Sequence, residues 1–277
     1  RYAGIDLSPG AIAEARAMAS DLALSNVELD VADLRDLPSG LGNFDYIIAH
    51  GFYSWVPADV RDDLLGTLCR CLSPDGIAFV SHNTMPGCAL RGIAWSLLRP
   101  HVAGIGDPAR RVSEARSMAA LVAEAMADQP GLAAMLAGEF RDVAERHEFH
   151  VLHDDLAVVN HPVLLREIVA EADAHGLTWL ADADVYRHPA PAYGEKMNAW
   201  LAAADRLTRE HVIDHLRLRR YRESLFVHRA RGLGTPLAGE RLANMHVRAS
   251  NTMAERHGSA PRSQADGDRT PAGVQRM

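Results

Sequence analysis

Short apolar runs alternate with amphipathic stretches through the first hundred residues. The apolar runs lie at residues 1–6, 26–31, 44–49 and 77–81, and their length and their aromatic and β-branched content predict buried strands. Helices are predicted between them, at residues 11–24 and 58–72. Strands that alternate with helices in this way predict an α/β fold with a parallel sheet and right-handed crossovers.

The pattern changes after about residue 100, and the second half is predicted to be mainly helical. The predicted helices are residues 109–128, 132–147, 162–176, 195–204 and 208–219, with short strands at 177–180 and 224–228. Ser8 and Asp107 are predicted N-caps, each followed by a proline, and Gly176 is a predicted C-cap. Residues 254–277 are polar with few apolar side chains, which predicts a disordered tail.

The rest of the chain is organised around residues 44–57, FDYIIAHGFYSWVP. This stretch opens with a predicted buried strand and ends near Pro57, where a helix is predicted to begin. The connection at residues 50–55 is too aromatic and too polar to be a simple turn. Ligands of open α/β sheets bind beyond the carboxyl ends of the strands, so this loop is predicted to lie at a binding edge.

Two acidic residues end neighbouring predicted strands. Asp6 ends the first, where an acid commonly accepts hydrogen bonds from both ribose hydroxyls of a nucleoside cofactor. Asp33 ends the second, where an acid could accept a hydrogen bond from an adenine amine. The alternative role for Asp6 is a turn or cap residue, but Ser8 already serves as the predicted cap. The two acids suit a neutral adenosine and disfavour a ligand rich in phosphate.

The composition narrows the class of partner and compartment. The 277 residues are 48% hydrophobic and 23% charged, which is typical of a globular protein. The net charge is −7 without a concentrated basic stripe, so nucleic acid is not an expected partner. Three cysteines predict reduced thiols and a cytoplasmic protein. No apolar run approaches the length of a membrane span, so no membrane partner is expected.

Four segments together resemble the class I S-adenosylmethionine-dependent methyltransferases: GIDLSPGAIAEAR, DVADLRDLP, FDYIIAHGFYSWVP and LSPDGIAFVSHNTMPG. More narrowly, they are similar to the bacterial group that carries a methyltransferase regulatory domain, which includes the rickettsial outer-membrane-protein lysine methyltransferases. The combination of HGFYSWVP with SHNTMPG is specific, whereas very many methyltransferases share the segment around Asp6. The resemblance covers about residues 1 to 230.

This resemblance implies a Rossmann-like S-adenosylmethionine-binding methyltransferase domain at residues 1–100. It also implies a helical methyltransferase regulatory domain at 101–182 and an extension of helices and a strand at 183–232. The implied partner is a methyl acceptor, a protein lysine or another amine. The oligomeric state stays open, although helical insertions of this kind often form homodimers.

The resemblance also carries over site residues. The implied cofactor contacts lie at three strand ends and are Asp6, Leu7, Asp33, Leu34, His50 and Gly51. Tyr53 and Asn83 fall where the group's loops face the transferable methyl, and they are the candidate catalytic residues. Phe52 and Trp55 are the candidate substrate contacts, because aromatic faces can hold a cationic lysine side chain. The alternative is that these rings pack the loop onto the sheet.

One family feature is missing from the sequence. Class I methyltransferases open with a strand and a glycine-rich loop that approaches the methionine moiety, whereas this sequence starts at Arg1, already in a predicted strand. We therefore expect an N-terminal truncation that leaves the cofactor site incomplete and strand edges unpaired.

Other interpretations of the sequence remain. The first alternative is a catalytically incomplete remnant that acts as a partner-binding or regulatory protein. The second is a nicotinamide-dependent oxidoreductase, which Asp6 would also suit, but the dinucleotide fingerprint is lacking. His50 is either a general base or a hydrogen-bonded structural residue. The histidines at 147, 150 and 153 are spaced so that a helix would not point all three at one centre, so no metal site is expected.

Overall fold

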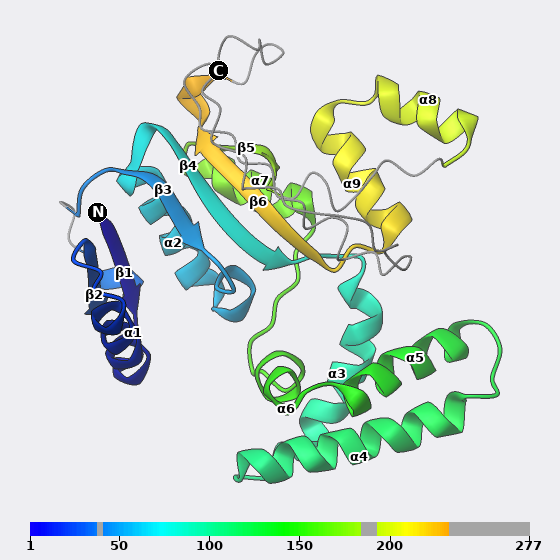
Figure 1. The fold of residues 1–277 in the computed structure, drawn as a ribbon. Helices are drawn as coiled ribbons and strands as arrows, with labels where there is room; N and C mark the ends of the chain where they lie inside the picture. The colour runs from blue at the N-terminus through cyan, green and yellow to red at the C-terminus, as the bar shows by residue number, and fades with distance from the viewer. Residues whose placement is uncertain (38–40, 184–192, 233–277) are drawn as a thin grey trace, which may run out of the picture. The chain divides into compact units, whose positions relative to one another are not determined.

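The computed structural model describes residues 1–37, 41–183 and 193–232 (Figure 1). The predicted disordered tail at 254–277 lies outside these residues. Within them the chain forms two β-sheets with helices around them, an α/β fold as the sequence predicted.

The first sheet pairs β1 (Tyr2–Asp6) with β2 (Val27–Val31) in parallel, and α1 (Pro9–Asp21) connects them. The side chain of Ser8 accepts a hydrogen bond from the Ala11 amide at 3.2 Å, which confirms the predicted N-cap. This contact matters because the first amides of a helix have no partner within the helix.

The second sheet has the order β3–β4–β6–β5. Its strands are β3 (Phe44–Ala49), β4 (Leu72–Asn83), β6 (Tyr221–His228) and β5 (Leu177–Asp182). The predicted parallel arrangement holds for β3 and β4, but β6 is antiparallel to both of its neighbours, so the sheet is mixed. Among the described residues, β1 is not hydrogen-bonded to β3, and the two sheets are separate.

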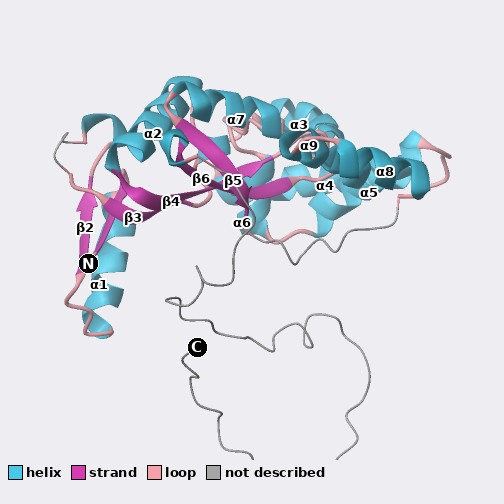
Figure 2. Ribbon diagram, turned by 90° about the horizontal axis from the view of Figure 1, so that it is seen from above, coloured by secondary structure: helices cyan, strands magenta, loops and turns pink. Residues whose placement is uncertain are grey.

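One face of the second sheet is covered by α2 (Ala58–Cys71) and α7 (Leu165–Ala174) (Figures 1 and 2). The buried side chains of this core include Leu64, Leu65 and Leu68 of α2, Leu165 and Ile168 of α7, and Ala78, Val80, Trp179 and Phe226 of the strands. Helix α2 belongs to the first half of the chain and α7 to the second, so both halves contribute side chains to this core.

A second core lies among helices α3 (Cys88–Val102), α4 (Pro108–Met126) and α5 (Leu132–Glu145) (Figure 1). The chain then passes through the short α6 (Glu148–His150) and a π-helical turn at Val151–Asp155. The side chain of Asp107 accepts a hydrogen bond from the Arg110 amide at 2.7 Å, which confirms the second predicted N-cap.

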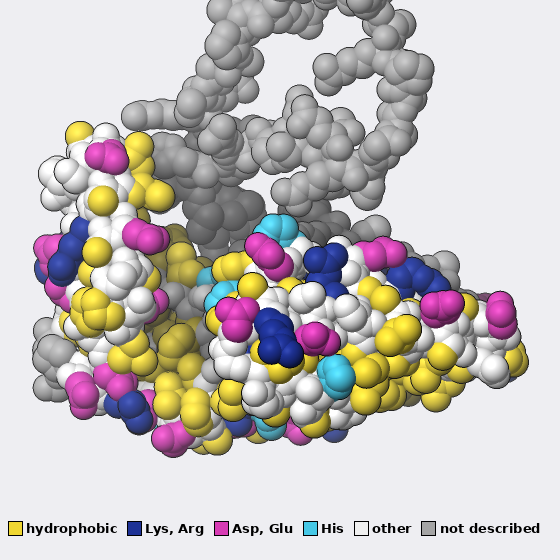
Figure 3. Space-filling view, turned by 90° about the horizontal axis from the view of Figure 1, so that it is seen from below, with side chains coloured by type: hydrophobic (Ala, Val, Ile, Leu, Met, Phe, Trp, Pro, Cys, Tyr) yellow, Lys and Arg dark blue, Asp and Glu magenta, His cyan; other side chains and the backbone are white. Residues whose placement is uncertain are grey.

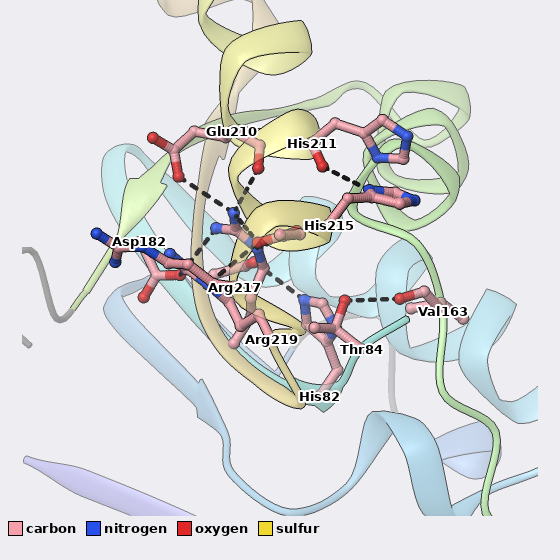
Figure 4. A network of polar contacts seen from close by, with 12 residues as sticks. His82, Thr84, Val163, Asp182, Glu210, His211, His215, Arg217 and Arg219 are labelled. Atoms are coloured by element: carbon pink, nitrogen blue, oxygen red, sulfur yellow. Dashed lines mark hydrogen bonds and ion pairs between the residues drawn. The ribbon is translucent and has the colours of Figure 1, made fainter. Parts of the chain in front are cut away.

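The last helices, α8 (Glu195–Ala203) and α9 (Arg206–Arg217), precede β6. A buried ionic network ties α9 to the sheet (Figure 4). The Arg222 guanidinium on β6 donates to Asp214 and Glu210 of α9 and to Asp182 of β5, at 2.8–3.1 Å. Its side chain is fully buried, so these acids supply the compensation that a buried cation requires.

The predicted division of the chain at residues 100 and 182 stays a prediction, but the sheet extends across it. Strands β5 and β6 come from the second half of the chain and complete the sheet that β3 and β4 begin. The predicted methyltransferase and regulatory regions therefore share one sheet and one core.

Candidate functional site

The carboxyl end of β1 carries Asp6 and Leu7, and both side chains are exposed. One Asp6 carboxylate oxygen accepts a hydrogen bond from the Ser8 amide at 2.7 Å. This contact turns the chain toward α1 and fixes the carboxylate at the strand end. Asp6 thus takes part in the turn as well as standing where a ribose-binding acid is expected.

The end of β2 leads into a 3-10 turn at Leu34–Asp36, which Asp33 caps by accepting from the Arg35 amide at 2.9 Å. The Arg35 guanidinium also binds the Asp33 carboxylate, at 2.6–3.1 Å, and this contact lowers the pKa of Asp33 to about 2. An adenine amine would have to share this carboxylate with Arg35. Leu34 is partly buried and packs against the core that contains α2.

The loop after β3 begins with His50 and Gly51. His50 is exposed, and its ring stacks on Phe79 of β4, with ring centroids 6.1 Å apart. Its Nε2 lies 3.3 Å from the hydroxyl of Tyr221 at the start of β6. Gly51 has a φ of +63°, which a glycine adopts without strain, and its amide donates to Ser81 Oγ at 2.7 Å.

Tyr53 belongs to the same loop, and it is completely buried. Its hydroxyl donates to the carboxylate of Glu171 on α7, and its ring lies 5.5 Å from the Arg61 guanidinium carbon. Burial, reinforced by the hydrogen bond to Glu171, raises the pKa of Tyr53 well above its ordinary value. The phenol is therefore a fixed, protonated donor at neutral pH.

Phe52 and Trp55, the predicted substrate contacts, are half-buried at the two ends of the turn Tyr53–Trp55. Phe52 packs against the core, so at least part of its ring serves to hold the loop.

Asn83, the other candidate catalytic residue, ends β4 and is half-buried. Its amide nitrogen in the main chain donates to Ser54 Oγ at 2.8 Å, so it is held against the loop after β3. Its side-chain Nδ2 donates to Asn160 Oδ1 at 2.9 Å. The structure thus brings His50, Tyr53 and Asn83 together at the adjacent ends of β3 and β4.

Several residues of this site were not identified from the sequence. They are Ser54, Ser81, Asn160, Glu171 and Tyr221, and each bonds to a residue of the loop or to a strand end. The partners of Tyr53, Asn83 and His50 lie 118, 77 and 171 residues away in the chain, so no local pattern could reveal them. The nearest signal in the sequence was the run of histidines at 147, 150 and 153, which precedes Asn160.

Neither a metal centre nor a membrane span emerges from the described residues. No group of three or more His, Cys, Asp and Glu side chains in them is placed to hold a metal ion. No helix among them is long and apolar enough to cross a membrane. On the face shown in Figure 3, Lys and Arg side chains are dispersed among Asp and Glu.

Two family models match the chain. The methyltransferase domain model matches residues 1–76, and the predicted methyltransferase regulatory domain model matches residues 147–228. With the α/β fold described above, these matches confirm the predicted resemblance: the chain carries a class I S-adenosylmethionine-dependent methyltransferase domain and a methyltransferase regulatory domain.

Relatives from Rickettsia support this assignment. The structure of PKMT2 from Rickettsia typhi is 27% identical, with a TM-score of 0.77 over 87% of this chain and 46% of that one, and PKMT2 has also been solved in complex with AdoHcy. The uncharacterized protein RP789 from Rickettsia prowazekii (strain Madrid E) is 30% identical over 82% of this chain and 41% of its own length. The chain thus spans less than half the length of these two relatives.

Proposed function

We propose that this chain is part of an S-adenosylmethionine-dependent methyltransferase. Its proposed acceptor is an amine, and a protein lysine is the favoured one. The observation that carries the proposal is the arrangement at the strand ends. Acids end the adjacent parallel strands β1 and β2, and a polar aromatic loop after β3 is tied to the end of β4. Ligands of open α/β sheets bind at such carboxyl ends.

The acids at the strand ends suit the cofactor, because carboxylates accept hydrogen bonds. A carboxylate can accept two hydrogen bonds, as the two ribose hydroxyls require, and Asp6 is exposed with one oxygen engaged by Ser8. Asp33 stays ionised, because Arg35 lowers its pKa, and so remains an acceptor. When bound, S-adenosylmethionine supplies a methyl group that its sulfonium has already activated.

Because the methyl group is already activated, the residues of this chain contribute by aligning the acceptor and by keeping its amine neutral. His50 and Tyr221 form an exposed polar pair at the end of β3, where His50 could accept an amine proton and the Tyr221 hydroxyl could hydrogen-bond to the imidazole. Phe52 and Trp55 flank the loop and offer aromatic faces to a lysine side chain. The name PKMT2 of the Rickettsia typhi relative agrees with a protein lysine acceptor.

Calorimetric titration of S-adenosylmethionine and AdoHcy into the full gene product tests cofactor binding. Replacing Asp6 with Ala removes the proposed ribose contact, and we expect affinity to fall about 10- to 100-fold, as for hydrogen bonds to a charged group. The matched control is Asp21→Ala, an exposed acid at the end of α1, which should bind within about twofold of the wild type. Binding that is unaffected by Asp6→Ala would refute the proposed ribose contact.

Methyl transfer to a bacterial lysate tests the acceptor. Label from S-adenosyl-[methyl-³H]methionine should enter native lysate proteins, but not proteins whose lysines have been blocked by acetylation. Equal labelling of both samples would exclude lysine as the acceptor. Absence of cofactor binding by the gene product would leave the alternative function, a partner-binding protein without catalysis.

A further inference from the structure

The loop after β3 is contacted by β4 and also by three residues that lie beyond residue 150: His161, Glu171 and Tyr221. The segment at residues 160–163 runs beside the end of β4, and a parallel bridge joins Val163 to Thr84. The Val163 amide donates to Asn83 O at 3.1 Å, and Thr84 Oγ1 donates to Val163 O at 2.7 Å (Figure 4). This segment therefore extends the sheet edge at the candidate site.

The same segment reaches the loop itself. The His161 amide donates to Ser54 O at 2.8 Å, while the Ser54 side chain accepts from the Asn83 amide. Ser54 is buried between them. The loop, the end of β4 and residues 160–163 thus form one hydrogen-bonded unit.

Two side chains of the regulatory domain complete this unit. Asn160 accepts from the Asn83 side chain at 2.9 Å and donates to Asp154 O at 3.3 Å, which fixes its orientation. Glu171 on α7 accepts the hydrogen bond of the buried Tyr53 hydroxyl. Both residues lie within 147–228, the match to the regulatory domain model.

We propose that Asn160 and Glu171 are positioning residues through which the regulatory domain sets the conformation of the loop after β3. Asn160 orients Asn83, and Glu171 anchors the loop through Tyr53. A change in the regulatory domain, such as binding of a ligand or partner, would reach the methyl-transfer site through these two contacts. The catalytic part of this inference rests on the proposed function, but the structural part does not.

Hydrogen–deuterium exchange of the full gene product tests the structural part without cofactor. In Glu171→Ala and Asn160→Ala, amides of residues 51–55 and 83 should exchange about tenfold faster, since each variant removes one of the loop's anchoring hydrogen bonds. Glu171→Gln keeps an oxygen acceptor for Tyr53 and should restore slow exchange. The controls are Asp173→Ala, an exposed acid on α7, and Val158→Ala, an exposed residue near Asn160.

A double-variant cycle separates a specific contact from general loosening. Tyr53→Phe deletes the same hydrogen bond from the loop side, so Tyr53→Phe with Glu171→Ala should perturb exchange no more than either change alone. Exchange within about twofold of the wild type in both alanine variants, or additive effects in the cycle, would overturn the proposal. If Glu171→Ala fails to fold, Tyr53→Phe replaces it, and if Asn160→Ala fails to fold, Asn160→Ser replaces it. Exchange within about twofold of the wild type would again overturn the proposal.

The activity arm measures methyl transfer. Asn160→Ala should lower kcat about 10- to 100-fold while AdoHcy affinity stays within about threefold, because it frees the Asn83 side chain, which helps to hold the loop, and leaves Asp6 untouched. An unchanged kcat beside accelerated exchange would overturn the link to catalysis. If the wild-type gene product does not bind AdoHcy, the proposed function fails, and the exchange experiment still decides whether Asn160 and Glu171 hold the loop.

Discussion

The stability of the fold should fall in mild acid because of one buried histidine. His82 lies on β4 with 1% of its surface exposed, and its Nε2 is 3.1 Å from Ser224 Oγ. Its Nδ1 is 3.3 Å from Asn83 O, and the Tyr53 ring packs against it edge-on. Burial lowers the pKa of His82 to about 3 from 6.5, and the nearby charge of Arg222 acts in the same direction.

The sign and size of the effect follow from proton linkage. The unfolded chain protonates His82 near pH 6.5, whereas the folded protein does so only near pH 3. The contribution to stability is therefore fully present above pH 6.5 and is lost as the pH falls toward 3. The loss is about 1.4 kcal/mol per pH unit in that window, or about 2 kcal/mol between pH 7 and pH 5.

Urea unfolding at pH 7 and pH 5 measures this loss, with His82→Gln as the comparison. The variant keeps a polar side chain near Ser224 but cannot titrate, and all other histidines are unchanged. The wild type should lose about 2 kcal/mol more than the variant between the two pH values, whatever the variant's stability at pH 7. Equal losses would mean that His82 is solvated or protonated in the folded protein, which would refute the reasoning.

Two further substitutions test the packing that supports the site. Gly87→Ala should destabilise the fold by about 3 kcal/mol, because the added Cβ would lie 2.1 Å from Leu218 O and 2.3 Å from Arg219 O. An unchanged Tm would contradict this close approach. Arg222→Met should cost about 3–5 kcal/mol in urea unfolding, since it leaves the buried Asp214 with Arg219 in place of two cations. A cost below about 1 kcal/mol would show that the network is hydrated.

The elements that the sequence predicts well are those with local signals. The caps at Ser8 and Asp107 fix two helix starts, and the apolar run Phe44–Ala49 forms β3 with the predicted bounds. The helix Cys88–Val102 was not predicted, because Gly92 and Pro100 are typical breakers of helices. It forms since Trp95 and Leu98 bury one face against neighbouring elements, and tertiary packing outweighs weak local propensity.

The remaining features depend on contacts between distant residues. Strand β6 was predicted from Ser224, but it begins at Tyr221 because the Arg222 charge is buried by acids on α9 and β5. A charged residue in a strand is usually exposed, so composition alone could not place Arg222 at the interior. Likewise, the sequence marked SHNTMPG as specific, and the structure gives a reason for its glycine in the close approach of residues 218–219.

The hydrogen bonds also bear on which residues meet an acceptor amine. Tyr53 is completely buried, and its raised pKa keeps it protonated, so it cannot serve as a base at neutral pH without leaving Glu171. The side chain of Asn83 is likewise engaged by Asn160. His50, by contrast, is exposed at the end of β3, with Tyr221 as its partner. We therefore propose that the two candidate catalytic residues, Tyr53 and Asn83, form the frame of the site and that His50 is the better placed proton acceptor.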